Sequence, residues 1–249
     1  MALSATFIEG AAGRILVTCH QPATPAPHAI IVLPAFGEEM NKSRRLVREV
    51  GVRLAAAEGY VTVVPDLLGC GDSEGEVGQA TLALWNRDLQ LVVEWARNAG
   101  ISRFSALAVR AGAMFLGGMR SHVDLERVVA WQPVDGTQTL RDLLRVQALN
   151  LKMGGDQGRG KPCTLDDLKQ EGESHELSGY CISSALARGM LESDTSFEEA
   201  RPGYTRIQFG GESDDGAVVV VTGERFWRAL EPGVNDALVA STVDLFAGR

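Results

Sequence analysis

The sequence is poor in histidine, and none of its four histidines lies beyond His175. Catalysis by an activated hydroxyl needs a neighbouring base, most often an imidazole. The chain beyond His175 contains no imidazole. No two histidines have the spacing of metal ligands, so no metal is expected. Gly155 and Gly160-Lys161 fit part of a phosphate-binding G-x-x-x-x-G-K loop, but no strand precedes them and Pro162 replaces the magnesium-binding hydroxyl. The sequence therefore predicts no cofactor.

Cysteine, positive charge and long apolar runs are also scarce. The four cysteines are far apart and lack paired spacing, which is typical of a reduced, cytoplasmic protein. A net charge of −8 disfavours nucleic acid as a partner. No apolar run reaches the roughly 18 residues of a membrane span, and no signal peptide is visible. We expect a small-molecule partner, and the sequence leaves the oligomeric state open.

What the chain does contain is an alternation of apolar strands and amphipathic helices from His28 onward. This alternation is typical of a parallel sheet with crossover helices, and 249 residues suit one large α/β domain. Two short strands about a glycine-rich turn predict an N-terminal hairpin over 6–19. The expected strands are 29–33, 61–64, 104–109 and 128–131, and the expected flanking helices are 41–58 and 81–99.

After Gly136 the alternation stops. Helical patterns over 139–153, 164–170 and 183–191 predict a helical cap insertion, 137–200, within a single domain, 1–249. Two further strands are expected at 205–209 and 217–221. Parallel neighbours need a crossover of about a dozen residues, so we expect these two strands to form a hairpin or not to be adjacent. A last amphipathic helix starts near residue 234.

One buried strand, Phe104–Val109, runs directly into small residues that start a packed helix. Only one or two positions are left for the bend, and Arg110 lies there. The helix that begins at this bend places its N-terminus beside Arg110, and a helix N-terminus favours anions. Arginine stays charged at working pH and serves neither as a nucleophile nor as a base. The sequence therefore predicts an anion-binding or ion-pair centre at Arg110.

The loop after the strand 29–33 is the richest in functional groups. Parallel-sheet topology places this loop beside Arg110, at the carboxyl ends of the strands. Glu38 and Glu39 are the candidate catalytic carboxylates. The candidate ligand-binding residues are Phe36, Lys42, Arg44 and Arg45, with Arg225 from the C-terminal part. The alternative is that these charges only solvate a helix start.

Two segments resemble motifs of the α/β-hydrolase superfamily. Ala108-Val109-Arg110-Ala111-Gly112 stands where that superfamily carries G-x-S-x-G, and the segment 66–75 resembles its D-x-x-G-x-G-x-S turn. In addition, four segments resemble the second type of exosortase A system-associated hydrolase: 38–45, 69–75, 131–134 and 223–227. Those bacterial proteins are encoded near the machinery that sorts PEP-CTERM proteins and makes exopolysaccharide.

The resemblance implies an α/β-hydrolase-like, mostly parallel sheet with an N-terminal hairpin, flanking helices and a cap. It places the nucleophile at Arg110, the acid at Asp214 and the base at Arg225 or Phe226, so the ordinary Ser-His mechanism is not available.

Two functions remain open. One is a hydrolase of ester, thioester or acyl-type substrates, in which Arg110 binds an anionic or carbonyl oxygen while Glu38 or Glu39 activates water. The alternative is a non-catalytic binding or scaffold protein, in which Arg110 holds a small anion or forms a buried ion pair with Glu39.

Overall fold

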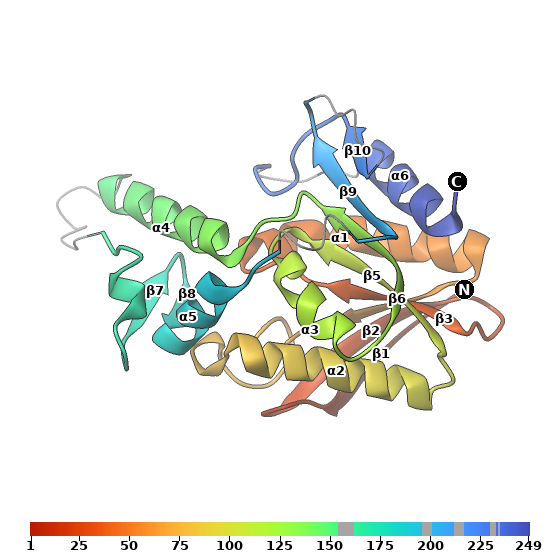
Figure 1. The fold of residues 1–249 in the computed structure, drawn as a ribbon, viewed down its shortest axis with the longest axis horizontal. Helices are drawn as coiled ribbons and strands as arrows, with labels where there is room; N and C mark the ends of the chain where they lie inside the picture. The colour runs from red at the N-terminus through yellow and green to blue at the C-terminus, as the bar shows by residue number, and fades with distance from the viewer. Residues whose placement is uncertain (154–161, 196–200, 212–216, 230–232, 234) are drawn as a thin grey trace.

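An eight-stranded mixed sheet forms the centre of the molecule (Figure 1). The computed structural model describes residues 1–153, 162–195, 201–211, 217–229, 233 and 235–249. The strand order is β1-β2-β4-β3-β5-β6-β9-β10. β1 and β2 form the expected antiparallel hairpin, β2 is antiparallel to β4, and the remaining neighbours are parallel. The strand bounds are β1 Ala2–Glu9, β2 Arg14–Gln21, β3 His28–Leu33, β4 Val61–Pro65, β5 Arg103–Val109, β6 Leu125–Trp131, β9 Tyr204–Phe209 and β10 Val218–Val221.

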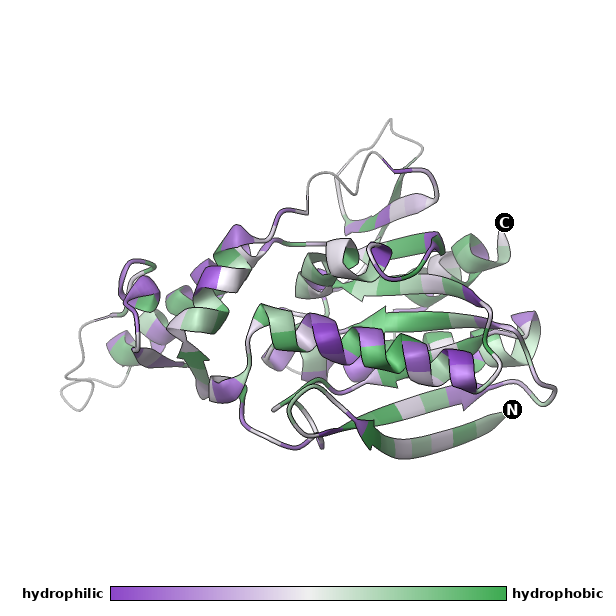
Figure 2. Ribbon diagram, turned by 60° about the horizontal axis from the view of Figure 1, so that its bottom comes forward, coloured by the Kyte–Doolittle hydropathy of each residue, from purple (hydrophilic) through white to green (hydrophobic). Residues whose placement is uncertain are grey.

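Helices cover both faces of this sheet. α2 (Leu82–Asn98) and α3 (Leu116–Arg120) pack on one face, and α1 (Glu38–Arg53) and α6 (Asp236–Ala247) pack on the other. The central strands therefore lie between two cores, which explains their uninterrupted apolar sequence. In Figure 2 these strands are mostly green, while the helices outside them alternate between green and purple. The expected mostly parallel α/β sheet with flanking helices is confirmed.

The segment between β6 and β9 lies at one end of the molecule, and we call it the insertion (Gly136–Glu192) (Figure 1). The helices expected at 139–153 and 183–191 are α4 (Gly136–Met153) and α5 (Ser184–Glu192). The helix expected at 164–170 is only a 3-10 turn, Asp167–Lys169. A hairpin that the sequence analysis did not predict, β7 (Ser174–Leu177) with β8 (Tyr180–Ser183), lies between the turn and α5.

The prediction for the last two strands is wrong. β9 and β10 are adjacent and parallel, with Val218 opposite Arg206 and Val221 opposite Phe209. The rule of a dozen residues applies to crossovers that carry a helix. Here the chain has only to run back about 10 Å, the length of three residues of strand. Eight residues separate Phe209 from Val218, which is long enough to cover that distance.

Two buried carboxylates hold the loop that follows β4. Asp88 of α2 is fully buried and accepts hydrogen bonds from the amides of Ala11, at 2.7 Å, and Leu68, at 3.0 Å, as expected for a buried acid. Asp66 accepts from the Asp72 amide at 3.1 Å. Gly71 has φ 57°, and a Cβ there would lie 2.0 Å from Asp66 Oδ2. These contacts fix the conformation of the loop after β4.

No helix in the described residues has the length and apolar character needed to cross a membrane.

Candidate functional site

The bend after β5 has the geometry expected of a strand-turn-helix site. Arg110 has φ 51°, a left-handed conformation that costs a non-glycine residue about 1–2 kcal/mol. A 3-10 helix, Arg110–Phe115, follows at once. Gly112 is required there, because a Cβ would lie 2.1 Å from the carbonyl oxygen of Leu33. The bend therefore packs against the end of β3, and a residue with a strained backbone, Arg110, stands at the carboxyl edge of the sheet.

Arg110 is held by three groups of the fold. Its Nε and Nη2 donate to the two carboxylate oxygens of Glu39, both at 3.1 Å. Its Nη1 donates to the carbonyl oxygen of Gln132 at 2.9 Å. Its Cζ lies 4.3 Å from the ring centroid of Trp227, within cation–π range. The side chain of Arg110 is 6% exposed and that of Glu39 is 23% exposed, so this is a largely buried, bidentate ion pair.

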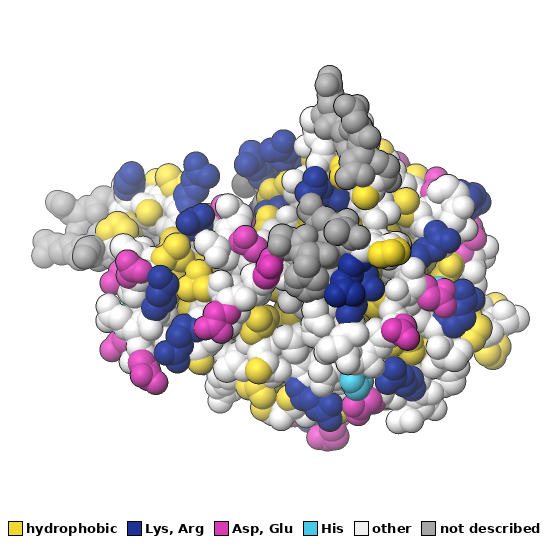
Figure 3. Space-filling view, viewed as in Figure 1, with side chains coloured by type: hydrophobic (Ala, Val, Ile, Leu, Met, Phe, Trp, Pro, Cys, Tyr) yellow, Lys and Arg dark blue, Asp and Glu magenta, His cyan; other side chains and the backbone are white. Residues whose placement is uncertain are grey.

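A cavity of about 230 Å³ lies beside this pair, and we call it the elbow cavity. The start of α1 contributes Glu38, Glu39 and Lys42 to its wall, and α4 of the insertion faces them. In the space-filling view the surface is hollowed between the insertion and the body of the molecule, with Lys and Arg side chains on both sides (Figure 3). The remaining lining residues are Phe36, Arg110, Val134, Thr139, Asp142, Leu143, Val146, Ser178, Tyr180 and Trp227.

The β7–β8 turn brings the insertion onto the loop before α1. Gly37 has φ 63°, and a Cβ there would lie 3.2 Å from the ring of Tyr180. Tyr180 also packs on Phe36, with ring centroids 5.5 Å apart. Burial, and secondarily the charge of Glu38, raise the pKa of Tyr180. Ser178 Oγ is buried and has no hydrogen-bond partner in the part of the chain that is described. One wall of the elbow cavity therefore offers an aromatic ring and a free hydroxyl.

The structure brings together only some of the predicted site residues. Arg110, Glu38, Glu39, Phe36 and Lys42 all line the elbow cavity. The other three lie elsewhere: Arg44 pairs with Asp66 on another side of α1, Arg45 is exposed, and Arg225 donates to the Phe209 carbonyl at 3.3 Å. Asp214 and the segment Gly155–Lys161 lie outside the described residues.

Among the described residues, no pair of a hydroxyl or thiol with a histidine lines the elbow cavity. None of the described residues that line it is a histidine or a cysteine. His28 bonds Ser105 Oγ inside the sheet, and His175 bonds a backbone carbonyl within the insertion. Burial raises the pKa of Cys70 to about 12, which keeps that thiol protonated. Across the described segments, no group of three His, Cys, Asp or Glu side chains is placed to hold a metal ion.

Two residues of the Arg110 centre were not predicted from the sequence. Gln132 has φ 40°, and besides binding Arg110 it accepts the Phe209 amide at 3.0 Å through its side chain. Trp227 is two positions beyond Arg225, and its ring covers the guanidinium of Arg110. Both belong to segments that carried the family resemblance, Trp131–Val134 and Gly223–Trp227. The contacts of Gln132 and Trp227 with Arg110 could be identified only from the structure, because no local sequence pattern distinguishes these two residues from core residues.

Comparison with solved structures gives the α/β-hydrolase fold. Est1E from Butyrivibrio proteoclasticus, with ferulic acid bound, is 14% identical over 98% of both chains, with a TM-score of 0.62. A monoglyceride lipase from Saccharomyces cerevisiae is 12% identical, covers 100% of this chain and 94% of its own, and has a TM-score of 0.58. A thioesterase domain from the curacin biosynthetic pathway is 15% identical over 99% and 100%, with a TM-score of 0.53.

No protein-family model matches the chain, and no curated protein matches it in sequence. The likeness to these structures is therefore one of fold.

Proposed function

Because the chain has the α/β-hydrolase fold with an arginine at the bend after β5, we propose that it is a binding protein built on this fold. It holds a small organic molecule in the elbow cavity and forms no covalent acyl-enzyme. The observation that carries the proposal is that all three nitrogens of the Arg110 guanidinium donate to Glu39 and Gln132. A buried cation whose three nitrogens are all bonded within the fold is part of the cavity wall and does not act as a reagent.

The degenerate triad follows from the same proposal. A guanidinium supplies no nucleophile, and the hydroxyls of the cavity have no imidazole beside them. Thr139 Oγ1 donates to the Asp135 carbonyl at 2.8 Å, and the raised pKa of Tyr180 keeps the phenol protonated. Activation of a serine hydroxyl by an imidazole, the step that hydrolases of this fold need, therefore has no counterpart among the described residues of the elbow cavity.

The lining indicates the class of ligand. Phe36, Tyr180 and Trp227 offer aromatic surfaces, and Ser178 Oγ is a buried hydroxyl still able to donate. Lys42 Nζ lies 3.4 Å from the Trp227 carbonyl, and no described carboxylate pairs with it. A small aromatic carboxylate fits this set, with its ring against the aromatic side chains and its charge toward Lys42.

A second candidate function rests on Glu38. It lines the same cavity, is exposed, and forms no ion pair with the described residues, in contrast to Glu39. As a general base it would activate water against an ester or thioester bound there, without a covalent intermediate. The family resemblance further leads us to expect that either activity serves exopolysaccharide or PEP-CTERM protein-sorting machinery.

Binding of ferulic acid, followed by tryptophan fluorescence, tests the proposal. We expect saturable binding to the wild type. Leu143→Trp, which fills the elbow cavity from α4, abolishes it, and Leu149→Trp, on an exposed part of the same helix away from the cavity, is the matched control and retains it. Equal binding by the Leu143 variant, or no binding by the wild type, contradicts the proposal.

Two activity measurements distinguish the candidates. We expect no labelling by a fluorophosphonate and no turnover of p-nitrophenyl butyrate. Stoichiometric labelling would reveal a nucleophile and reject the binding role. Turnover without labelling, lost in Glu38→Gln, would establish the second candidate instead.

A further inference from the structure

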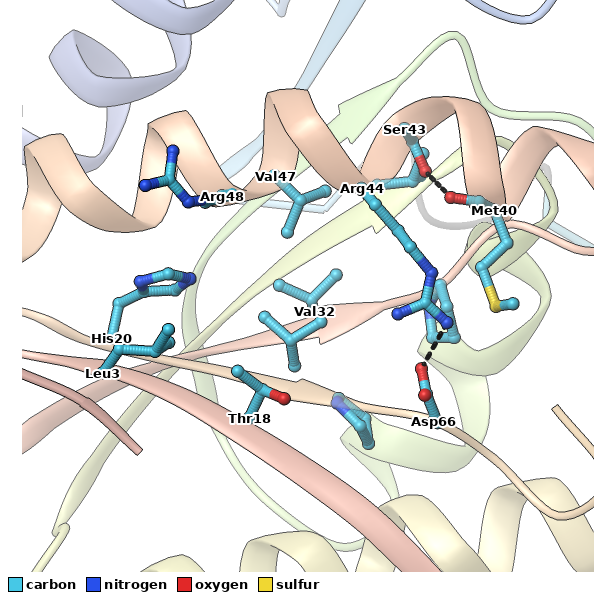
Figure 4. A pocket seen from close by; sticks show the side chains of 14 residues that line it. Leu3, Thr18, His20, Val32, Met40, Ser43, Arg44, Val47, Arg48 and Asp66 are labelled. Carbon is cyan, nitrogen blue, oxygen red and sulfur yellow. Dashed lines mark hydrogen bonds and ion pairs between the residues drawn. The ribbon is translucent and has the colours of Figure 1, made fainter. Parts of the chain in front are cut away.

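A second cavity, of about 170 Å³, lies between α1 and the sheet, on a different side of α1 from the elbow cavity. We call it the α1 cavity. Figure 4 shows its lining side chains between the helix and the strands. Four valines form its apolar wall: Val32, Val47, Val64 and Val109. Arg44 and Arg48 of α1 and His20 of β2 contribute the basic groups.

The sheet edge and the choice of side chains together create this space. β1 and β2 extend the sheet beyond β4, so the face beside α1 continues through Thr18 and His20. Thr18 lies opposite Val64 in the β2–β4 register. Short, β-branched residues at these positions leave a space that larger side chains would fill. The cavity is thus a property of the rigid sheet and α1, not of a loop.

In the ion pair at one end of the α1 cavity, both oxygens of the carboxylate have hydrogen-bond partners, whereas the arginine keeps unused N–H groups. Asp66 Oδ1 accepts from Arg44 Nη2 at 3.0 Å, and Oδ2 accepts from the Asp72 amide, so each carboxylate oxygen has a partner. The guanidinium has five N–H groups, and the pairing with Asp66 uses one of its nitrogens. The side chain of Arg44 is 45% exposed and that of Asp66 is 6% exposed. Arg44 therefore keeps donors for an external acceptor at the cavity.

We propose that the α1 cavity binds a small monocarboxylate with an apolar tail. The carboxylate accepts hydrogen bonds from the free N–H groups of Arg44, and the tail packs against the four valines. A cavity of about 150 Å³ accommodates a benzene ring in a protein interior, so 170 Å³ suits a tail of about six carbons. Asp66, which is paired with Arg44, is the one acid among the described lining residues, so no other carboxylate repels the ligand. Arg48 and His20 are the remaining ionisable groups of the lining.

Hexanoate and hexan-1-ol are the probes that separate charge from apolar contact. We expect hexanoate to raise the Tm of the wild type in a concentration-dependent way. Arg44→Gln weakens hexanoate binding about tenfold or more, because a charge-assisted hydrogen bond is lost, and leaves hexan-1-ol binding unchanged. Arg45→Gln, the neighbouring exposed arginine outside this cavity, is the matched control and binds like the wild type.

A cavity-filling variant locates the site. Thr18→Phe keeps a residue suited to a strand and fills the space beside Val64, so it abolishes binding of both probes; its Tm without ligand shows that it folds. Leu143→Trp, which closes the elbow cavity, retains hexanoate binding, so the two sites succeed or fail separately. No hexanoate binding by the wild type, equal binding by Thr18→Phe, or equal binding by Arg44→Gln would each overturn the proposal.

Discussion

Two arginine–carboxylate pairs involve the first two turns of α1, and they differ in how fully the arginine is used. Arg110 gives all three nitrogens to Glu39 and Gln132, under the ring of Trp227. Arg44 gives one nitrogen to Asp66 and stays half exposed. A buried guanidinium must be satisfied inside the fold, whereas an exposed one keeps donors for a ligand. We therefore propose a structural role for Arg110 at the bend and a binding role for Arg44.

Helix geometry explains why two charges of one loop reach different cavities. Each residue turns an α-helix by about 100°, so Glu39 and Arg44, five positions apart, point about 140° away from each other. Lys42, three positions after Glu39, stays on the side of the elbow cavity. The charged residues at the start of α1 are thus divided between the elbow cavity and the α1 cavity once the helix forms.

The largest effect is expected from removing Glu39. Glu39→Ala leaves the Arg110 charge buried without its partner, which costs about 3–5 kcal/mol of the free energy of unfolding. Urea denaturation measures this loss. The double variant Glu39→Gln with Arg110→Met removes the charge as well, and we expect it to be clearly more stable than Glu39→Ala. A loss below about 1 kcal/mol in the single variant would show that the pair is as solvated as a surface ion pair.

Asp88 sharpens the comparison, because it is a buried acid bound by two backbone amides and by no arginine. Asp88→Ala leaves two buried N–H groups unpaired and costs about 2–4 kcal/mol. Burial raises the pKa of Asp88, so the folded state holds this proton more tightly than the unfolded state. Its contribution to the free energy of unfolding is therefore present below the ordinary pKa of about 3.9 and is lost as the pH rises through the raised value.

The free energy of unfolding of the wild type and of Asp88→Asn, measured from pH 3.5 to 7, checks the sign. We expect the advantage of the wild type to shrink with rising pH over the lower part of that range. A difference that is constant, or that grows with pH, would contradict the raised pKa.

Local patterns were enough to predict most of the fold. The apolar strand before Arg110 and the helices 81–99 and 139–153 follow from periodicity, which depends on burial alone. The parallel pairing of β9 with β10 depends instead on how far the connection must reach. The β7–β8 hairpin turns at Ser178-Gly179, and this two-residue turn is the sequence signal from which the hairpin could have been predicted.

The site was only partly predictable, for a physical reason. Sheet topology brought Glu39 to Arg110, because the carboxyl ends of neighbouring parallel strands meet. In contrast, topology does not specify side-chain direction. Arg225 and Trp227 lie on one short segment, yet only Trp227 reaches the guanidinium. A one-dimensional motif match cannot separate two such neighbours.

The smallest effect on stability is expected at Arg44, and it tests the comparison most directly. Arg44→Gln removes a half-exposed cation, and the buried Asp66 keeps its hydrogen bond from the Asp72 amide, so the free energy of unfolding falls by less than about 1 kcal/mol. In 1 M salt, where the Debye length is about 3 Å, this difference disappears, whereas the cost of Glu39→Ala persists. If Arg44→Gln lowered the free energy of unfolding as much as Glu39→Ala, Arg44 would have the same structural role as Arg110. Its donors would then be unavailable to a carboxylate, so this denaturation experiment also tests the premise of binding in the α1 cavity.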